Sequence, residues 1–145
     1  MRQNKDFITL LCFKYFIMNS IFIIYVADQS KSKAFYSNVL QKEAVLDVPG
    51  MTEFEINAGT KLGIMPENGI AKLLGENIVH PATGNGIPRC ELYLYVDSPD
   101  EYYERALKLG ARAISPATAR DWGDKVAYCS DFDGNILAFA ISMKI

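Results

Sequence analysis

At 145 residues, with 50% hydrophobic and 22% charged side chains, the chain is long enough for one compact domain and too apolar for a disordered protein. A formal net charge of −2 gives no electrostatic reason to expect a nucleic-acid partner. Three cysteines without paired spacing (Cys12, Cys90 and Cys129) predict reduced thiols in a cytoplasmic protein, and a single histidine, His80, argues against histidine-based metal or triad chemistry.

Residues 1–20 form an N-terminal extension ahead of the first clear strand. Its apolar run from Phe7 to Phe13 is too short to span a bilayer, and Lys14 interrupts it, so we expect no membrane partner. Because Met18 directly precedes the strand, we interpret Met18 as the natural start of the protein. An extra element that packs on the fold or on a partner is the alternative, and a signal peptide is a weaker one.

Residues 21–65 predict a first βαβββ module. The β-branched apolar run 21–27 predicts a strand, and Asp28 can cap the helix that follows. Apolar residues recur at helical spacing over residues 30–40. The remaining strands are expected at 42–48, 51–57 and 61–65, with a Pro49-Gly50 turn after the first of these.

Residues 66–89 are rich in glycine and proline, which predicts a linker with at most one turn of helix. A connection of this length inside a compact domain is usually functional or mobile.

Residues 90–145 repeat the order of the first module. A strand is expected at 91–97, and Ser98 caps a helix that ends at Leu109-Gly110. The last strands are expected at 111–115, 124–130 and 135–142, with Asp133-Gly134 as a turn between the final two. Two copies of one strand–helix–strand unit therefore determine the fold.

Several pieces of the chain resemble the vicinal oxygen chelate superfamily, which includes glyoxalases, extradiol dioxygenases and bleomycin-resistance proteins. These pieces are YVAD and KAFYSNVL in the first module, and LYVDSPDEYYERALKLGA and DWGDKVAYCSDFDGN in the second. The match runs from Ile21 to Ile141. The resemblance implies an α+β fold in which paired βαβββ modules form a curved mixed sheet around a shared cavity, with helices on the convex faces. It also implies a homodimer.

Alternation along the strands separates the residues that face the helices from those that face the cavity. The helix-facing set is Phe22, Ile24, Val26, Leu92, Leu94, Val96, Leu137 and Phe139. The opposite set is Ile21, Ile23, Tyr25, Glu91, Tyr93, Tyr95, Ile136, Ala138 and Ala140. Tyr25, Glu91, Tyr93 and Tyr95 are therefore the candidate ligand-binding residues on the concave face, together with Trp122 from the segment before the hairpin.

Metal-dependent members of the superfamily bind a divalent ion through two side chains from each module. The resemblance places those ligands at Ile21, Gly63 or Ile64, Glu91 and Ala138 in this chain. Only Glu91 has a side chain that can coordinate, and one carboxylate does not replace the hydration shell of a divalent ion. We therefore expect no metal site and no cofactor.

The candidate residues allow more than one role. Glu91 is a solvated strand residue, a ligand contact, or a general acid or base if it is buried beside tyrosines. Tyr93 and Tyr95 either fill space on the sheet or recognise a ligand. Trp122 covers the rim of the core or forms an aromatic wall for a planar ligand.

The leading hypothesis for function is a glyoxalase- or bleomycin-resistance-like protein that binds a small aromatic or cationic molecule without a metal. One alternative is a metal-dependent lyase, isomerase or dioxygenase of the same superfamily. The other is an interaction protein whose cavity has collapsed, because one scaffold hosts many functions.

Overall fold

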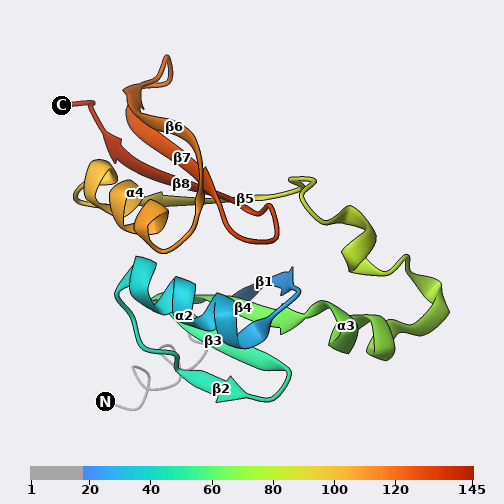
Figure 1. The fold of residues 1–145 in the computed structure, drawn as a ribbon. Coiled ribbons are helices and arrows are strands. Elements are labelled where there is room, and N and C mark those ends of the chain that lie inside the picture. Colours follow the sequence, from blue (N-terminus) through green and yellow to red (C-terminus); the bar gives the residue numbers. More distant parts are fainter. Residues whose placement is uncertain (1–17) are drawn as a thin grey trace, which may run out of the picture.

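The computed structural model describes residues 18–145, so the expected extension over residues 1–17, and the question of the start site, lie outside the described residues. The chain folds into two modules, each a four-stranded mixed sheet with one helix against it (Figure 1). The strand orders are β1-β4-β3-β2 and β5-β8-β7-β6, so the second sheet repeats the topology of the first. The α+β architecture of paired βαβββ modules is confirmed.

The first module contains one helix and four strands. They are β1 (Ser20–Val26), α2 (Gln29–Leu40), β2 (Leu46–Val48), β3 (Met51–Asn57) and β4 (Thr60–Pro66). The Asp28 carboxylate caps α2, accepting a hydrogen bond of 2.9 Å from the Lys31 backbone N–H. β2 is shorter than the predicted strand over 42–48, because Gln41 adopts a left-handed conformation and Lys42 N–H bonds back to the Ser37 carbonyl. Gln41 and Lys42 therefore form the C-terminal cap of α2, at the position where the strand was expected to begin.

The connection between the modules is more ordered than a linker with one helical turn. It holds α3 (Glu67–Leu74) and the 3₁₀ turns η1 (Gly75–Asn77) and η2 (Pro81–Gly84). Ile70 buries its side chain and anchors α3. His80 is a capping residue, because its Nδ1 accepts a bond from Ala82 N–H and its Nε2 lies 3.0 Å from Asn68 Oδ1.

The second module has the same order of elements. They are β5 (Glu91–Tyr95), α4 (Pro99–Lys108), β6 (Arg112–Ala119), β7 (Asp124–Ser130) and β8 (Ile136–Ser142). Ser98 caps α4 as predicted. β5 ends two residues before the predicted boundary. β6 runs four residues past its predicted end, because pairing with β7 continues through register shifts on either side of Ser115.

The helix-covered faces of both sheets share one hydrophobic core. Phe54 from β3 and Phe139 from β8 are fully buried in it, with Phe35 from α2 and Ala106 from α4. The helices also touch directly, since the Arg105 guanidinium donates a 2.8 Å hydrogen bond to a carbonyl of α2. The edge strands β1 and β5 lie where the two sheets approach each other (Figure 1). No helix within residues 18–145 is long and apolar enough to cross a bilayer.

The D-F-D-G-N turn between β7 and β8 joins the modules. The buried Asp131 carboxylate accepts a 2.6 Å hydrogen bond from the Tyr36 hydroxyl of α2. Burial and the neighbouring Asp131 raise the pKa of Tyr36 well above its usual value. Asp133 in turn accepts a 2.9 Å bond from the Ala27 N–H at the end of β1. Gly134 has a φ of +87°, which favours glycine at the tip of the turn.

Candidate functional site

The sheet face turned away from the helix is called here the open face of each module. On β1, Ile24 and Val26 are buried under the helix, whereas Ile21, Ile23 and Tyr25 are exposed on the open face. Phe22 was predicted to face the helix, but its side chain is 49% exposed near the start of the strand.

The open face of the second module carries an aromatic cluster built around a carboxylate. Asp124 begins β7, and its Oδ2 accepts hydrogen bonds of 2.7 Å from Tyr93 and 2.9 Å from Tyr95. Trp122 Nε1 donates a 3.1 Å bond to the Tyr93 hydroxyl. The two tyrosine rings meet edge to face with centroids 5.5 Å apart. We call these four residues the tyrosine–aspartate cluster.

The cluster is buried at its centre and exposed at its rim. Asp124 is only 5% exposed, whereas Tyr95 is 68% and Trp122 is 51% exposed. Both rings therefore offer surface to a ligand above a carboxylate that is held in place. An aromatic or cationic group fits such a surface, because ring faces attract cations and stack on other rings.

The hydrogen bonds of the cluster fix its protonation states. The bond from Tyr93, followed by that from Tyr95, lowers the pKa of Asp124 although its partial burial opposes this, so the group is a carboxylate. Burial and the bond to Asp124 raise the pKa of Tyr93 to about 12, against the opposing bond from Trp122. The tyrosine hydroxyls are consequently neutral donors around a fixed negative charge.

Trp122 is positioned by the turn that leads into β7. Gly123 has a φ of +97° and closes the turn, with its N–H bonded to the Arg120 carbonyl and its carbonyl bonded to Met143 N–H. A side chain at Gly123 would also meet Lys144, because an added Cβ would lie 2.5 Å from the Lys144 Cε. The W-G-D sequence therefore places the indole beside Tyr93.

Small residues form the floor under the aromatic rings. Val126, Ala138 and Ala140 are fully buried on the open face, where Tyr93 and Tyr128 pack against them. Part of this face is therefore a small core of its own, separate from the core under the helices.

Glu91 does not belong to the tyrosine–aspartate cluster. It lies at the start of β5 opposite Ile136 and is exposed. Its nearest electrostatic effect is on Tyr128, whose pKa is raised first by burial and then by Glu91. Glu91 is exposed, so the described chain does not itself bury it beside tyrosines, the condition on which a general acid or base role was predicted.

Tyr25 lies on the other sheet. Among residues 18–145 it forms no aromatic pair with Tyr93 or Tyr95. It lines a cavity of about 250 Å³ near the free edge of β1, together with Arg89 and Cys90. The structure therefore unites Tyr93, Tyr95 and Trp122, but it leaves Tyr25 and Glu91 outside their cluster.

The open face of the first module is mainly aliphatic. Ile21, Ile23, Leu46 and Val48 are exposed there. An ion pair on this face joins Lys61 Nζ to the nearly buried Glu53 carboxylate at 2.9 Å.

The residues at the four ligand positions do not fit a divalent metal ion. Gly63 lies on the open face next to Ile21 and Ile23, and Ala138 is buried under Tyr93, so these positions offer no donor atom to join Glu91. Within residues 18–145, no group of three or more His, Cys, Asp or Glu side chains is arranged to hold a metal ion. A metal needs several such donors.

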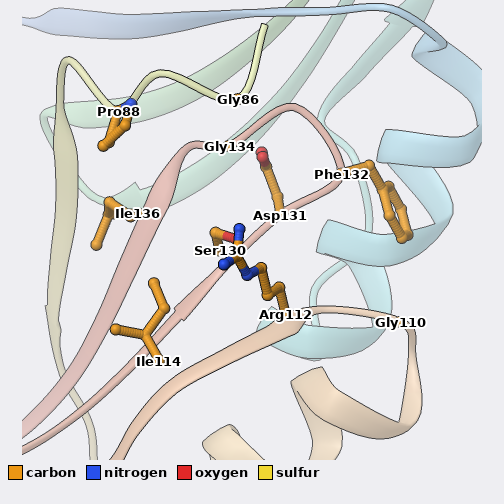
Figure 2. A pocket seen from close by; sticks show the side chains of 10 residues that line it. All are labelled: Gly86, Pro88, Gly110, Arg112, Ile114, Ser130, Asp131, Phe132, Gly134 and Ile136. Carbon is orange, nitrogen blue, oxygen red and sulfur yellow. The ribbon is translucent and has the colours of Figure 1, made fainter.

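A cavity of about 420 Å³ lies at the end of the second sheet nearest the D-F-D-G-N turn (Figure 2). Figure 2 shows the Arg112 side chain reaching toward Ser130 in the middle of the cavity, with Ile114 and Ile136 on one side. Pro88 of the connection between the modules lies on the same side of this view, and Phe132 lies on the other side (Figure 2).

Sequence reasoning missed Asp124, Arg112 and Ser130 as site residues. Asp124 was assigned only as the first residue of a strand, although alternation places Asp124, Tyr128 and Ser130 on one side of β7. The pairing of β7 with β8 and β6, which brings these residues under the tyrosines and beside Arg112, is a long-range property.

Comparison with known proteins agrees with this architecture. Residues 18–144 match the model of a family described as glyoxalase-like domain. The fold is similar to that of a glyoxalase-related enzyme from Fulvimarina pelagi, with a TM-score of 0.72 and 20% identity over 86% of this chain and 88% of that chain. It is also similar to a glyoxalase/bleomycin resistance protein/dioxygenase from Nocardioides, with a TM-score of 0.68 and 18% identity over 97% of this chain and 95% of that chain. No curated protein sequence matches the chain. At these identities, the structural similarity concerns the fold alone.

Proposed function

The chain belongs to the glyoxalase-like domain family, and from that premise we propose that it binds a small aromatic or cationic molecule on the open face of its second module without a metal ion. The tyrosine–aspartate cluster is the observation that carries this proposal. It combines two exposed aromatic rings with a buried carboxylate, which are the groups that recognise an aromatic or cationic ligand.

The rings of the cluster form an exposed surface, so a ligand bound there needs a second wall. We propose that a second copy of the chain supplies it, in a homodimer. The exposed aliphatic residues on the open face of the first module, among them Ile21 and Ile23 of β1, support this proposal, because exposed apolar side chains on one face favour interaction sites. Sedimentation of Ile23→Glu against the unmodified chain tests it. The dimer proposal is wrong if the unmodified chain sediments as a monomer at all concentrations.

Trp122 is the only tryptophan in the chain, so its fluorescence reports directly on the proposed site. We would titrate metal-free protein with benzyltrimethylammonium, a neutral benzyl alcohol, a glutathione conjugate and divalent metal ions. We expect saturable changes of emission with aromatic compounds, and a matching rise in melting temperature. A response to metal ions alone would contradict the proposal and favour the metal-dependent lyase, isomerase or dioxygenase.

Matched variants separate the ring from the charge. Tyr95→Ala removes an exposed ring and should weaken binding about tenfold, whereas Tyr95→Phe keeps the ring and should bind neutral aromatics normally. Asp124→Asn should weaken the binding of benzyltrimethylammonium more than the binding of benzyl alcohol, because it removes the negative charge beneath the rings. Tyr25→Ala is the control on the other sheet. If Tyr95→Ala binds as well as the unmodified chain, the ligand does not use this cluster, and an interaction protein becomes the better description.

We also propose a cytoplasmic location, supported by Cys90 and Cys129, which are both free thiols. Cell fractionation with an antibody against the chain would test it.

A further inference from the structure

We propose that the cavity at the end of the second sheet is an anion subsite, in which Arg112 and Ser130 bind a carboxylate or phosphate group of the ligand. The link between this subsite and the aromatic ligand rests on the proposed function. The anion subsite itself stands on the residues of the cavity.

Arg112 and Ser130 lie on the same open face as the tyrosine–aspartate cluster. Arg112 on β6 pairs directly with Ser130 on β7, which pairs with Ile136 on β8. Paired residues point to the same side of a sheet, and Tyr93 occupies the next row on that side. Tyr93 is two residues (about 7 Å) further along the strands than this row and three strand spacings (about 14 Å) from Arg112, so a ligand that bridges the cluster and the cavity spans about 16 Å.

Both polar groups of the subsite are available for a ligand. The ion pairs among residues 18–145 join Lys33 to Asp47, Lys61 to Glu53 and Lys125 to Asp100, and none uses Arg112. Ser130 is only 6% exposed, and its hydroxyl takes part in none of the hydrogen bonds formed within those residues. The Ser130 hydroxyl can therefore donate a hydrogen bond to a bound anion without giving up a partner within the chain.

Two carboxylates could oppose an anion in this cavity. Asp131 lines it, but its oxygens already accept bonds from the Tyr36 hydroxyl, from the N–H groups of Asp133 and Asn135, and from the Asn135 amide. Glu91 is on the opposite edge strand, three strand spacings or about 14 Å from Arg112. The Asp131 oxygens are thus turned toward these donors, and Arg112 is the basic side chain that lines the cavity in the described part of the chain.

The chemistry of the cavity selects the class of ligand. A guanidinium matches the planar geometry of a carboxylate and the oxygens of a phosphate, and the Ser130 hydroxyl adds a donor beside it. Ile114, Ile136 and Pro88 supply apolar walls. The volume of about 420 Å³ lies in the range of small-molecule sites. The ligand that would engage both ends of the face is an elongated aromatic compound with an anionic group about 16 Å from the ring that contacts Tyr93.

Nuclear magnetic resonance of the full chain tests the subsite with inorganic phosphate, acetate and benzoate as probes. We expect shifts confined to residues around Arg112 and Ser130, and the stronger of the phosphate and acetate responses identifies the anion type. Arg112→Gln should weaken anion binding at least tenfold, Arg112→Lys less, and Ser130→Ala a few-fold. Arg89→Gln, an arginine of the other cavity, is the matched control and should bind normally.

The result that overturns the subsite is equal anion binding by the unmodified chain and Arg112→Gln, with an unchanged melting temperature showing that the variant is folded. Shifts scattered over all basic residues would overturn it as well. Trp122 fluorescence keeps the two proposals apart. If benzyltrimethylammonium still binds to Arg112→Gln, the cluster works without the subsite. If anions bind at Arg112 but no aromatic compound alters Trp122 emission, the proposed function fails and the anion subsite stands.

Discussion

The two modules are alike where they face the helices and different on their open faces. Under the helices, Leu62 and Ile64 of β4 have counterparts in Leu137 and Phe139 of β8, and all four are buried in one core. On the open faces, the first module exposes aliphatic side chains around the Lys61–Glu53 pair, whereas the second exposes the tyrosine–aspartate cluster. The βαβββ unit thus constrains alternate strand positions through packing and leaves the others free for recognition.

The largest expected effects are losses of stability from substitutions in the core that the two modules share. Phe54→Ala and Phe139→Ala should each lower the free energy of unfolding by about 3–5 kcal/mol, because each leaves a cavity in the common core. Ile23→Ala and Ile114→Ala, on exposed positions of the two sheets, should each cost less than about 1 kcal/mol. Urea denaturation measures all four. Equal costs inside and outside the core would contradict the division into two kinds of face.

A somewhat smaller effect is expected at the joint between the modules. Asp131→Ala removes the acceptor of four donors and should destabilise the fold by about 2–4 kcal/mol. Tyr36→Phe removes a single bond and should cost about 1 kcal/mol. Denaturant midpoints of both variants measure the two losses of stability. Similar values for the two would show that Asp131 holds the helix and not the turn.

A smaller effect is expected from Tyr93 on the second open face, as a loss of folding stability at alkaline pH. The pKa of Tyr93 is raised by burial to about 12, whereas an unfolded tyrosine ionises near pH 10. Between these values the unfolded chain has released a proton that the native state retains, so stability is full below about pH 10 and falls as the pH rises toward 12. Tyr93→Phe should show a shallower decline in urea denaturation between pH 9 and 12. If stability declined identically in the unmodified chain and in Tyr93→Phe, the decline would come from other groups, such as buried Cys129 and Tyr36.

The smallest effect concerns the first open face. Lys61→Met removes the partner of Glu53 and should cost about 0.5–1 kcal/mol, since the lysine itself is well exposed to solvent. The Trp122 fluorescence titration of the same variant stays unchanged if the cluster binds its ligand without the first open face of either copy. A loss of ligand binding in Lys61→Met would show that both open faces contribute to one site.

Local sequence signals predicted most of the fold and only part of the site. Alternation on β1 and β5, the Asp28 and Ser98 caps and the Asp133-Gly134 turn depend on neighbouring residues, and they placed the elements correctly. The short β2 and the helix α3 departed from expectation, because hydrogen bonds that close α2 and the burial of Ile70 override local propensity.

The grouping of site residues depended on contacts between distant strands. Tyr93, Tyr95 and Trp122 were predicted together and meet, but their common partner Asp124 was missed because the pairing of β5, β8 and β7 cannot be read from any one segment. The D-F-D-G-N turn was recognised as a family signature. Its role in joining the modules through Tyr36 became visible only in the packed structure.

Gly63 has a consequence for how the chemistry of this chain can change over evolution. A Cβ added there would lie 2.9 Å from the Ile23 Cγ1 and 3.1 Å from the Ile21 Cγ2, so any side chain at Gly63 requires both isoleucines to move. A metal-ligating residue at this position therefore requires the exposed Ile21 and Ile23 side chains to shift. Smaller residues at these two positions would make such a substitution easier, so changes at the three positions are coupled. The descendants of this chain are more readily diversified through the rings and charges of the second module.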